Sequence, residues 1–272
     1  MCRQFVYVAD SEVHVRSATK PVGPDNHDRS AVKSLRKAVA VLSAVARAER
    51  PLSMAELAVR AGIARPTAYR LVQTLAGEGH IVQDPIDGRL SIGFAVLPLA
   101  ASLLDRNRLR LEALPHLHAL AQETGERANL GILHRDEVLY LAGVEKPSLP
   151  TIYTRFGKTA PAHCSSLGKA VLAYMPEAQL TPLLKSMPLT PQTPTSITTL
   201  PGFAHDLEEI RRRGYAIDRE ENVSGSFCIG ATIFDAKNHP VGAISLSGRA
   251  LEPLMARVDT LRHTAEVISH VL

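Results

Sequence analysis

Apolar residues recur at helical spacing in the first third of the chain, and their pattern predicts three consecutive helices. The first pattern starts at Ser30, repeats every three or four residues and stops at Pro51. Ser53-Met54-Ala55-Glu56 has the spacing of a capping box, which predicts the start of a short second helix that ends at Gly62. Pro66 lies near the start of the third helix, where a missing N–H costs nothing.

A short hairpin pattern follows the third helix. Residues 81–82 and 90–92 are apolar strand segments, and residues 85–88 (Pro-Ile-Asp-Gly) between them are typical of a turn. The order of two helices, a tight turn, a third helix and a hairpin predicts a winged helix-turn-helix over residues 29–92.

The rest of the chain predicts a linker and a larger domain of mixed structure. Residues 93–107 repeat apolar positions at helical spacing and form the expected linker helix, while residues 108–272 alternate strand and helix patterns. Strands joined by short polar loops, with helices at the edges, predict an antiparallel α+β domain. Residues 186–202 are rich in Pro and Thr, which favours a long mobile loop. The expected strands cover residues 128–134, 137–144, 151–155, 215–218, 227–234 and 241–247, and the expected helices cover residues 109–124, 166–174, 176–185, 202–213 and 251–272.

Composition indicates a disordered N-terminal tail and the cellular compartment of the protein. Residues 1–28 are expected to be a disordered tail, because residues 19–28 are polar and rich in Pro and Gly. Cys2, Cys164 and Cys228 have no regular spacing, which argues against a disulfide framework and favours a reducing cytoplasm. The N-terminus lacks the apolar core of a signal peptide, and the apolar stretch 92–104 is too short to span a bilayer. We therefore expect a cytoplasmic protein without a membrane partner.

Positive charge gathers in the helix-turn-helix segment. The whole chain has 31 basic and 27 acidic residues, whereas residues 29–70 hold nine basic residues against Glu49 and Glu56. A helix-turn-helix inserts its second helix into the major groove of DNA, where Arg, Gln and Thr contact bases or phosphates. We therefore predict that the first helix, the reading helix and the wing contact double-stranded DNA. The candidate DNA-binding residues are Arg36, Lys37, Arg65, Thr67, Tyr69, Arg70, Gln73 and Arg89.

These charges have a simpler alternative interpretation, because scattered arginines often do no more than solvate a helical bundle. Tyr69 is ambiguous as well, since its ring can pack against the protein while its hydroxyl reaches a phosphate. The ordered series of capping box, glycine turn, proline-started helix and basic hairpin is more specific than scattered charge, and it favours DNA binding.

The residues from about Ser30 to Leu272 resemble IclR-type transcriptional regulators. The resemblance is carried by residues 35–93, 120–145, 161–175 and 211–250. It implies a GAF-like effector domain, homodimers or dimers of dimers, palindromic operators near promoters, and an organic acid or aromatic metabolite as effector. It does not decide between repression and activation. Pro66 departs from the family pattern, since many relatives have Ser before the Thr, and one possible phosphate contact is lost.

The resemblance also implies a set of effector-binding residues in the C-terminal domain. They come from the segment before Gly168, from the strand that ends at Asp218, and from two strands with the patterns Phe-Cys-Ile-Gly and Ala-Ile-Ser-Leu-Ser-Gly. The candidates are Ser166, Leu167, Asp218, Cys228, Ser245 and Ser247.

Elementary chemistry makes this set reasonable for an anionic metabolite. Hydroxyls at positions i and i+2 of a strand point to the same face, and a helix N-terminus offers free N–H groups to an anion. Asp218 favours a ligand that also carries a donor. Each residue has a structural alternative: Ser245 and Ser247 as satisfied strand hydroxyls, Cys228 as a core thiol and Asp218 as a cap. Arg155 either pairs with an acidic effector or is a solvated strand-end charge.

The sequence therefore predicts a ligand-responsive DNA-binding transcriptional regulator that forms homo-oligomers and needs no cofactor. A first alternative is a ligand-independent DNA-binding protein whose C-terminal domain only assembles oligomers. A second is an enzyme that uses Cys164 or Cys228 with His163, but the chain lacks a nucleophile elbow, a phosphate loop and a paired acid and base. His163 and Cys164 also have no partners at zinc-ligand spacing, so neither a metal site nor an enzymatic function is expected.

Overall fold

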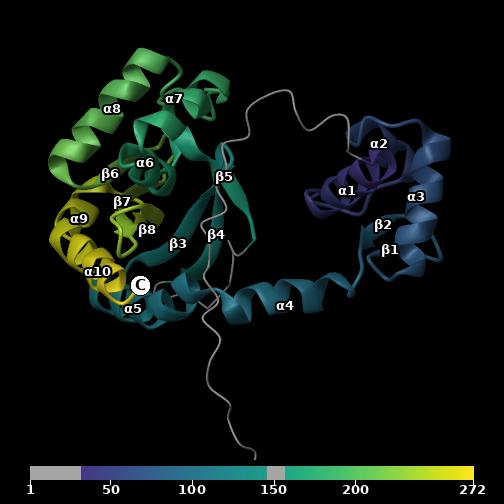
Figure 1. The fold of residues 1–272 in the computed structure, drawn as a ribbon, viewed down its shortest axis with the longest axis horizontal. Helices are drawn as coiled ribbons and strands as arrows, with labels where there is room; N and C mark the ends of the chain where they lie inside the picture. The colour runs from purple at the N-terminus through teal and green to yellow at the C-terminus, as the bar shows by residue number, and fades with distance from the viewer. Residues whose placement is uncertain (1–31, 146–156) are drawn as a thin grey trace, which may run out of the picture. The chain divides into compact units, whose positions relative to one another are not determined.

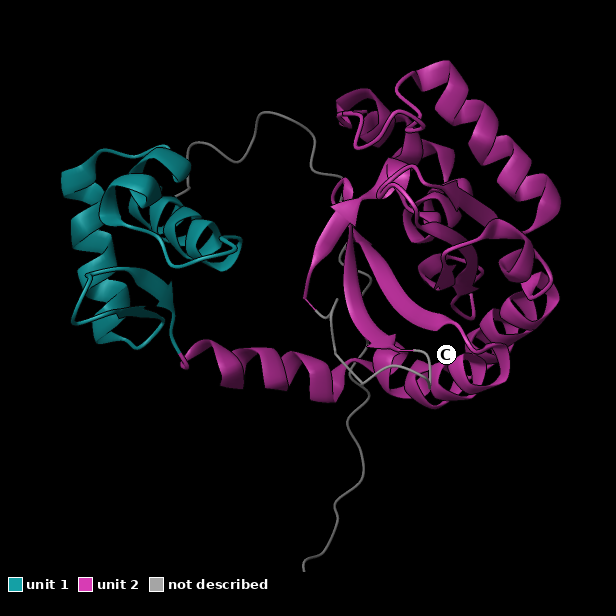
Figure 2. Cartoon of the chain, turned by 180° about the vertical axis from the view of Figure 1, so that it is seen from behind, with its two compact units in different colours: residues 1–93 teal, residues 94–272 magenta. Residues whose placement is uncertain are grey.

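The computed structural model describes residues 32–145 and 157–272, which belong to two compact units divided between Gly93 and Phe94 (Figure 2). The predicted tail at residues 1–28, the expected strand at residues 151–155 and the candidate effector contact Arg155 lie outside the described residues. The residues of the predicted linker form α4 (Val96–Arg106), which groups with the second unit.

The first unit has the predicted order of helices and strands. It contains α1 (Lys33–Ala46), α2 (Met54–Arg60), α3 (Arg65–Gly77), β1 (Ile81–Gln83) and β2 (Leu90–Ile92). The capping box at the start of α2 is confirmed: the Glu56 backbone N–H donates to Ser53 Oγ at 3.3 Å, and the Ser53 backbone N–H donates to Glu56 Oε2 at 2.8 Å. These bonds from Ser53, with the Arg50 side chain beside them, hold the pKa of Glu56 at about 2, so its carboxylate is charged at neutral pH.

One small core holds the first unit together. Leu52 pairs with Leu90 as an isolated antiparallel bridge, which attaches the chain before α2 to the hairpin. A Cβ at Gly93 would come within 2.1 Å of the Gly79 carbonyl oxygen, so the close approach of the hairpin to the end of α3 requires glycine. The core consists of Val41, Val45, Leu52, Leu57, Val72, Ile81 and Leu90.

The second unit is built on a six-stranded sheet with the order β5-β4-β3-β8-β7-β6 (Figure 1). All neighbouring strands are antiparallel, which confirms the α+β prediction. The strand β5 was not predicted, since three residues are too few to give a sequence pattern. The strands are β3 (Arg127–His134), β4 (Glu137–Val144), β5 (Thr159–Pro161), β6 (Ala216–Arg219), β7 (Phe227–Phe234) and β8 (Pro240–Gly248).

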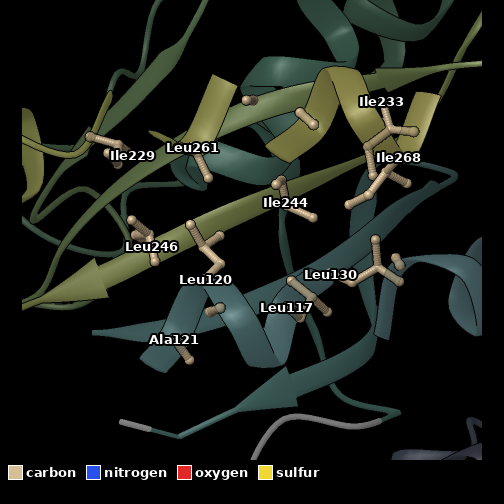
Figure 3. Packing of buried hydrophobic residues seen from close by; sticks show 14 of the residues in the cluster. Leu117, Leu120, Ala121, Leu130, Ile229, Ile233, Ile244, Leu246, Leu261 and Ile268 are labelled. Atoms are coloured by element: carbon tan, nitrogen blue, oxygen red, sulfur yellow. The ribbon is translucent and has the colours of Figure 1, made fainter. Parts of the chain in front are cut away.

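Helices cover both faces of this sheet. One core lies between the sheet and α5 (Arg108–Thr124), α9 (Leu251–Met255) and α10 (Val258–His270), and Figure 3 shows Leu117, Leu120, Leu261 and Ile268 within it. A second core lies under α6 (Ser166–Ala173), α7 (Glu177–Ser186) and α8 (Leu200–Arg213). The prediction of one helix over residues 251–272 is wrong, because the chain breaks at Ala256–Arg257, between Leu254 and Val258, which both pack into the first core.

Candidate functional site

The reading helix α3 has one buried and one exposed side. Ala68 and Val72 are fully buried against α1 and α2. The predicted base contacts Arg65, Arg70 and Gln73 are exposed within the first unit. The helix therefore presents the donors and acceptors that a DNA major groove requires.

The other predicted DNA contacts differ in exposure, and one of them, Arg89, is bound by groups of its own domain. Arg36 and Lys37 on α1 are exposed, Tyr69 is 54% exposed, and Thr67 is half-buried. Arg89 is bound to its own domain: its Nη1 donates to the Pro51 carbonyl at 3.0 Å, and its guanidinium lies 3.4 Å from Asp87 and 3.7 Å from Glu56. Arg89 thus braces the wing, and its contact with DNA stays a prediction.

In the second unit, four of the predicted effector residues surround one small cavity of about 10 Å³, room for about one water molecule. These four are Ser166, Asp218, Cys228 and Ser245. The wall is completed by Tyr140, Ser165, Asn222, Val223 and Ser226. Most groups in the wall are polar, and Ser165, Ser166, Asp218 and Ser245 among them are buried, so the cavity offers several hydrogen-bonding groups to a small polar ligand.

Strand register and two glycines bring these residues together. Asp218 on β6 pairs with Cys228 on β7, and Cys228 pairs with Ser247 on β8, so the three lie in one row across the sheet. A Cβ at Gly230 would come within 2.6 Å of the Ser166 carbonyl oxygen, and one at Gly168 would come within 2.3 Å of the Ala162 carbonyl oxygen. Gly230 therefore allows the start of α6 to lie directly on the sheet, and Gly168 allows α6 to pack against the short turn 162–164 that precedes it.

Two predicted effector residues lie outside this cavity. Leu167 is buried in the core under α6, so an effector contact from it would rest on its backbone and stays a prediction. Ser247 hydrogen-bonds to Cys228 Sγ at 3.2 Å and lines a second cavity of about 280 Å³. The two cavities share Val223 and Ser226 as walls.

Asp218 is the acidic group of the small cavity, and burial raises its pKa to about 7. The nearby Glu221 carboxylate raises it further, whereas the Glu221 backbone N–H, which donates to Asp218 Oδ1 at 2.7 Å, and the Lys169 ammonium lower it. Near neutral pH, both protonation states of this carboxyl are therefore populated. The protonated form can donate a hydrogen bond, and the ionised form can only accept.

Sequence reasoning missed the buried ion cluster behind the cavity. Lys169 on α6 is 1% exposed, and its Nζ lies 2.6 Å from Glu221 Oε1 and 2.9 Å from Asp206 Oδ2. Arg213 lies 3.5 Å from Asp206 and completes the cluster. Burial raises the pKa of Glu221, which the Lys169 ammonium opposes. The available signal was a single lysine in the otherwise uncharged helix sequence Ser-Leu-Gly-Lys-Ala-Val-Leu-Ala.

A second missed residue is Asn129 on β3. It is 2% exposed and its Nδ2 donates to Ser245 Oγ at 3.2 Å and to Ser247 Oγ at 3.1 Å. No local sequence pattern marks it, because its partners are more than a hundred residues away along the chain.

The histidine and cysteine that suggested enzyme chemistry are embedded in the fold. Burial raises the pKa of the Cys164 thiol to about 11, so it is a neutral thiol at physiological pH. Burial likewise lowers the pKa of His163, whose Nε2 lies 3.2 Å from the Thr190 carbonyl oxygen. In the parts of the chain that the structure describes, no three His, Cys, Asp or Glu residues gather as metal ligands, and no helix is long and apolar enough to cross a membrane.

Family models match both units of the chain. Residues 34–85 match the IclR helix-turn-helix domain, and residues 101–270 match the C-terminal domain of the bacterial transcriptional regulator IclR. The chain belongs to the IclR family. It is thus an IclR-family transcriptional regulator with a helix-turn-helix DNA-binding domain and a C-terminal effector domain.

Individual IclR relatives support the assignment. The chain is 35% identical over 217 residues to the glycerol operon regulatory protein of Streptomyces coelicolor, which covers 80% of this chain and 85% of the relative. An IclR regulator from Alicyclobacillus acidocaldarius has a similar structure, with a TM-score of 0.77, 29% identity, and coverage of 88% of this chain and 98% of the other. An IclR homologue from Microbacterium hydrocarbonoxydans, complexed with 4-hydroxybenzoate, shares the fold with a TM-score of 0.71, 24% identity, and coverage of 88% and 100%.

Proposed function

We propose that this IclR-family protein senses a small organic acid in its C-terminal domain and adjusts its binding to a palindromic operator. The observation that carries the proposal is the small cavity at which Ser166, Asp218, Cys228 and Ser245 meet, although they come from four separate elements. Buried polar groups are costly unless they are paired, so such a convergence needs a reason, and binding a polar ligand is one. The 4-hydroxybenzoate complex of the Microbacterium relative supports a small acid as the ligand class.

The size of the cavity sets a condition on this function. About 10 Å³ is too small for an organic acid, so the effector must widen the site. The loop that contains Val223 and Ser226 separates the small cavity from the one of about 280 Å³, and a shift of this loop would join the two. Effector binding and loop movement would then be one event.

Exposed apolar surface supports a homo-oligomer as the DNA-binding form. α4 has no buried residue, and Leu97, Leu99 and Leu103 are each more than 60% exposed. Val32, Leu35 and Val39 form a second exposed apolar stripe on one side of α1. We propose that these surfaces, including Leu97, Ala101 and Leu104 of α4, pack against a second subunit. A two-fold dimer would place two reading helices about 34 Å apart, which suits a palindromic operator. The proposed location of the protein is the cytoplasm, where it would meet this DNA.

Regulation then follows from differential affinity. An effector changes the population of two dimer arrangements only to the extent that it binds one more tightly than the other. The arrangement that matches the spacing of adjacent major grooves binds the operator, and the other does not.

The test is a fluorescence-anisotropy titration of the full-length protein with DNA from upstream of its own gene, with small carboxylates and aromatic acids added singly. We expect sequence-specific binding whose apparent affinity changes with at least one acid, and Ser245→Ala should weaken that response while DNA binding without effector is kept. Specific DNA binding that no acid alters, together with no thermal shift by any acid, would favour the ligand-independent alternative. Turnover that depends on Cys164 or Cys228 would favour the enzyme. A monomer in analytical ultracentrifugation, with and without DNA, would remove the dimer mechanism.

A further inference from the structure

Asn129 lies at the centre of three strands beside the cavity. Its backbone pairs with Ser245 of β8 on one side and with Gly143 of β4 on the other. Its side chain is 2% exposed, and its Nδ2 donates to Ser245 Oγ at 3.2 Å and to Ser247 Oγ at 3.1 Å. One amide group thus holds both serines of β8.

In this arrangement both serine oxygens accept a hydrogen bond from the Asn129 amide. A hydroxyl has one hydrogen, and an oxygen that already accepts from an amide keeps that hydrogen free to donate elsewhere. Ser247 Oγ lies 3.2 Å from Cys228 Sγ, and Ser245 is in the wall of the cavity. Both hydroxyls therefore keep a hydrogen that they can donate: Ser247 has the Cys228 sulfur within reach, where either atom can be the donor, and Ser245 has the cavity.

The other end of the amide does not compete for these hydroxyls. Asn129 Oδ1 is buried and has no hydrogen-bond partner within residues 32–145 and 157–272. A Cβ at Gly143 would lie 3.4 Å from this oxygen, so the glycine leaves it room. The opposite amide orientation would place Oδ1 against the serines and turn both hydroxyls toward the amide, away from the cavity.

We propose that Asn129 is a positioning residue that keeps the hydroxyl hydrogens of Ser245 and Ser247 free to donate. The pocket then selects a carboxylate, whose two oxygens both accept, over the corresponding amide, whose NH2 group can only donate. The inference rests on the proposed effector site and adds the chemistry of its selectivity. A merely structural role for Asn129 would change the affinity for acid and amide alike.

The first experiment compares acid and amide pairs as probes: lactate with lactamide, and benzoate with benzamide. Their dissociation constants for the full-length wild type are measured by calorimetry at one pH, beside those for Asn129→Asp and Asn222→Asp. Asn222 lines the same cavity and, within residues 32–145 and 157–272, makes no hydrogen bond to either serine, so Asn222→Asp adds the same charge and is the matched control. We expect at least about tenfold preference for the acid in the wild type, inversion of that preference in Asn129→Asp, and a smaller change without inversion in Asn222→Asp.

The second experiment needs no ligand. In a Cys2→Ser background, the rate of alkylation of Cys228 is measured against pH by mass spectrometry of its peptide, while buried Cys164 serves as an internal reference. A Ser247 hydroxyl that donates to the sulfur favours the thiolate, and a carboxylate at position 129 draws that hydroxyl away. The midpoint of the alkylation profile should therefore rise by about one pH unit in Asn129→Asp, and by less in Asn222→Asp.

The outcomes separate this inference from the proposed function. Preference of the wild type for amides, or equal changes in both variants, would overturn the role of Asn129 while leaving an effector site in place. If no probe binds the wild type, the proposed effector class fails, and the alkylation profile alone decides the role of Asn129: a rise specific to Asn129→Asp supports it, and profiles that match the control overturn it. Should Asn129→Asp not fold, Asn129→Leu replaces it, with loss of the acid preference expected and an unchanged preference contradicting the proposal.

Discussion

The two units carry polar residues in opposite ways. On α3, Arg65, Arg70 and Gln73, which are predicted to bind DNA, are exposed, so water solvates them. Behind the small cavity of the second unit, Lys169 is buried and ionic partners surround it. Removing an exposed charge costs little stability, whereas removing one member of a buried pair leaves its partner without compensation. The same kind of side chain is therefore replaceable in one unit and structural in the other.

The variant Lys169→Met tests most directly whether the buried charges stabilise the second unit. The change leaves Glu221 without its cation and Asp206 with Arg213 alone, and we expect the second unit to lose about 3–5 kcal/mol of its free energy of unfolding. Urea unfolding of the full-length protein, followed by circular dichroism, measures the loss.

Two further variants make the Lys169 test specific. Lys185→Met, at the exposed end of α7, is the matched control and should change the free energy by roughly 0.5 kcal/mol or less. The double variant Lys169→Met with Glu221→Gln should recover part of the loss, because it removes the stranded carboxylate. Equal losses for Lys169→Met and Lys185→Met would contradict the view that the buried pair is structural.

The buried carboxyl of Asp218 should make the stability of the second unit depend on pH. Its pKa is raised from an ordinary value of 3.8 to about 7, so between these values the folded protein holds a proton that the unfolded chain has lost. Stability should therefore fall as pH rises through this window and level off above pH 7, by about 2–3 kcal/mol between pH 5 and pH 8. Asp218→Asn should remove most of this fall in urea unfolding, while exposed Asp259→Asn should not. A slope unchanged in Asp218→Asn would show that other groups, such as Glu221, carry the dependence.

In the first unit, Arg70→Ala tests the opposite expectation. Loss of a base contact should weaken specific DNA binding by about 1–3 kcal/mol, and the free energy of unfolding should stay nearly unchanged. Arg60→Ala, an exposed arginine on the supporting helix, is the control. Anisotropy titrations on specific and random DNA at two salt concentrations measure the affinity, and urea unfolding measures the stability. Equal weakening on both DNAs would assign Arg70 to a phosphate contact and not to base reading.

The difference between the units also explains which parts of the structure could be predicted from the sequence. The elements of the first unit follow from neighbouring residues: Ser53 and Glu56 lie three apart, and Pro66 starts the helix that it belongs to. Local patterns likewise predicted β7 as residues 227–234, the bounds that the structure has. Short-range chemistry of this kind is readable without a structure.

The buried polar contacts of the second unit cannot be predicted from local sequence patterns. Lys169 meets Glu221 across 52 residues, and Asn129 meets Ser245 across 116. Residues 186–202 illustrate the same limit, because their composition predicts a mobile loop. In the structure, Thr193 and Ser196 hold this loop to the Glu221 carbonyl at 3.2 and 2.6 Å. Partners distant in sequence decided each of these cases, and the family resemblance supplied the effector candidates that local pattern did not.

The smallest expected effect is the best test of whether local chemistry shapes the first unit. Ser53→Ala removes the oxygen that accepts from Glu56 N–H and should cost about 1 kcal/mol, measured as a lower urea midpoint of the transition that includes α2. Ser43→Ala, an exposed serine within α1, is the matched control and should be neutral or slightly stabilising, because alanine favours helix interiors. If Ser53→Ala behaved like Ser43→Ala, the start of α2 would be held by the core around Leu57 and Val72 rather than by the cap. The position of α2, which supports the reading helix, would then depend on tertiary packing, as the arrangement of the small cavity does.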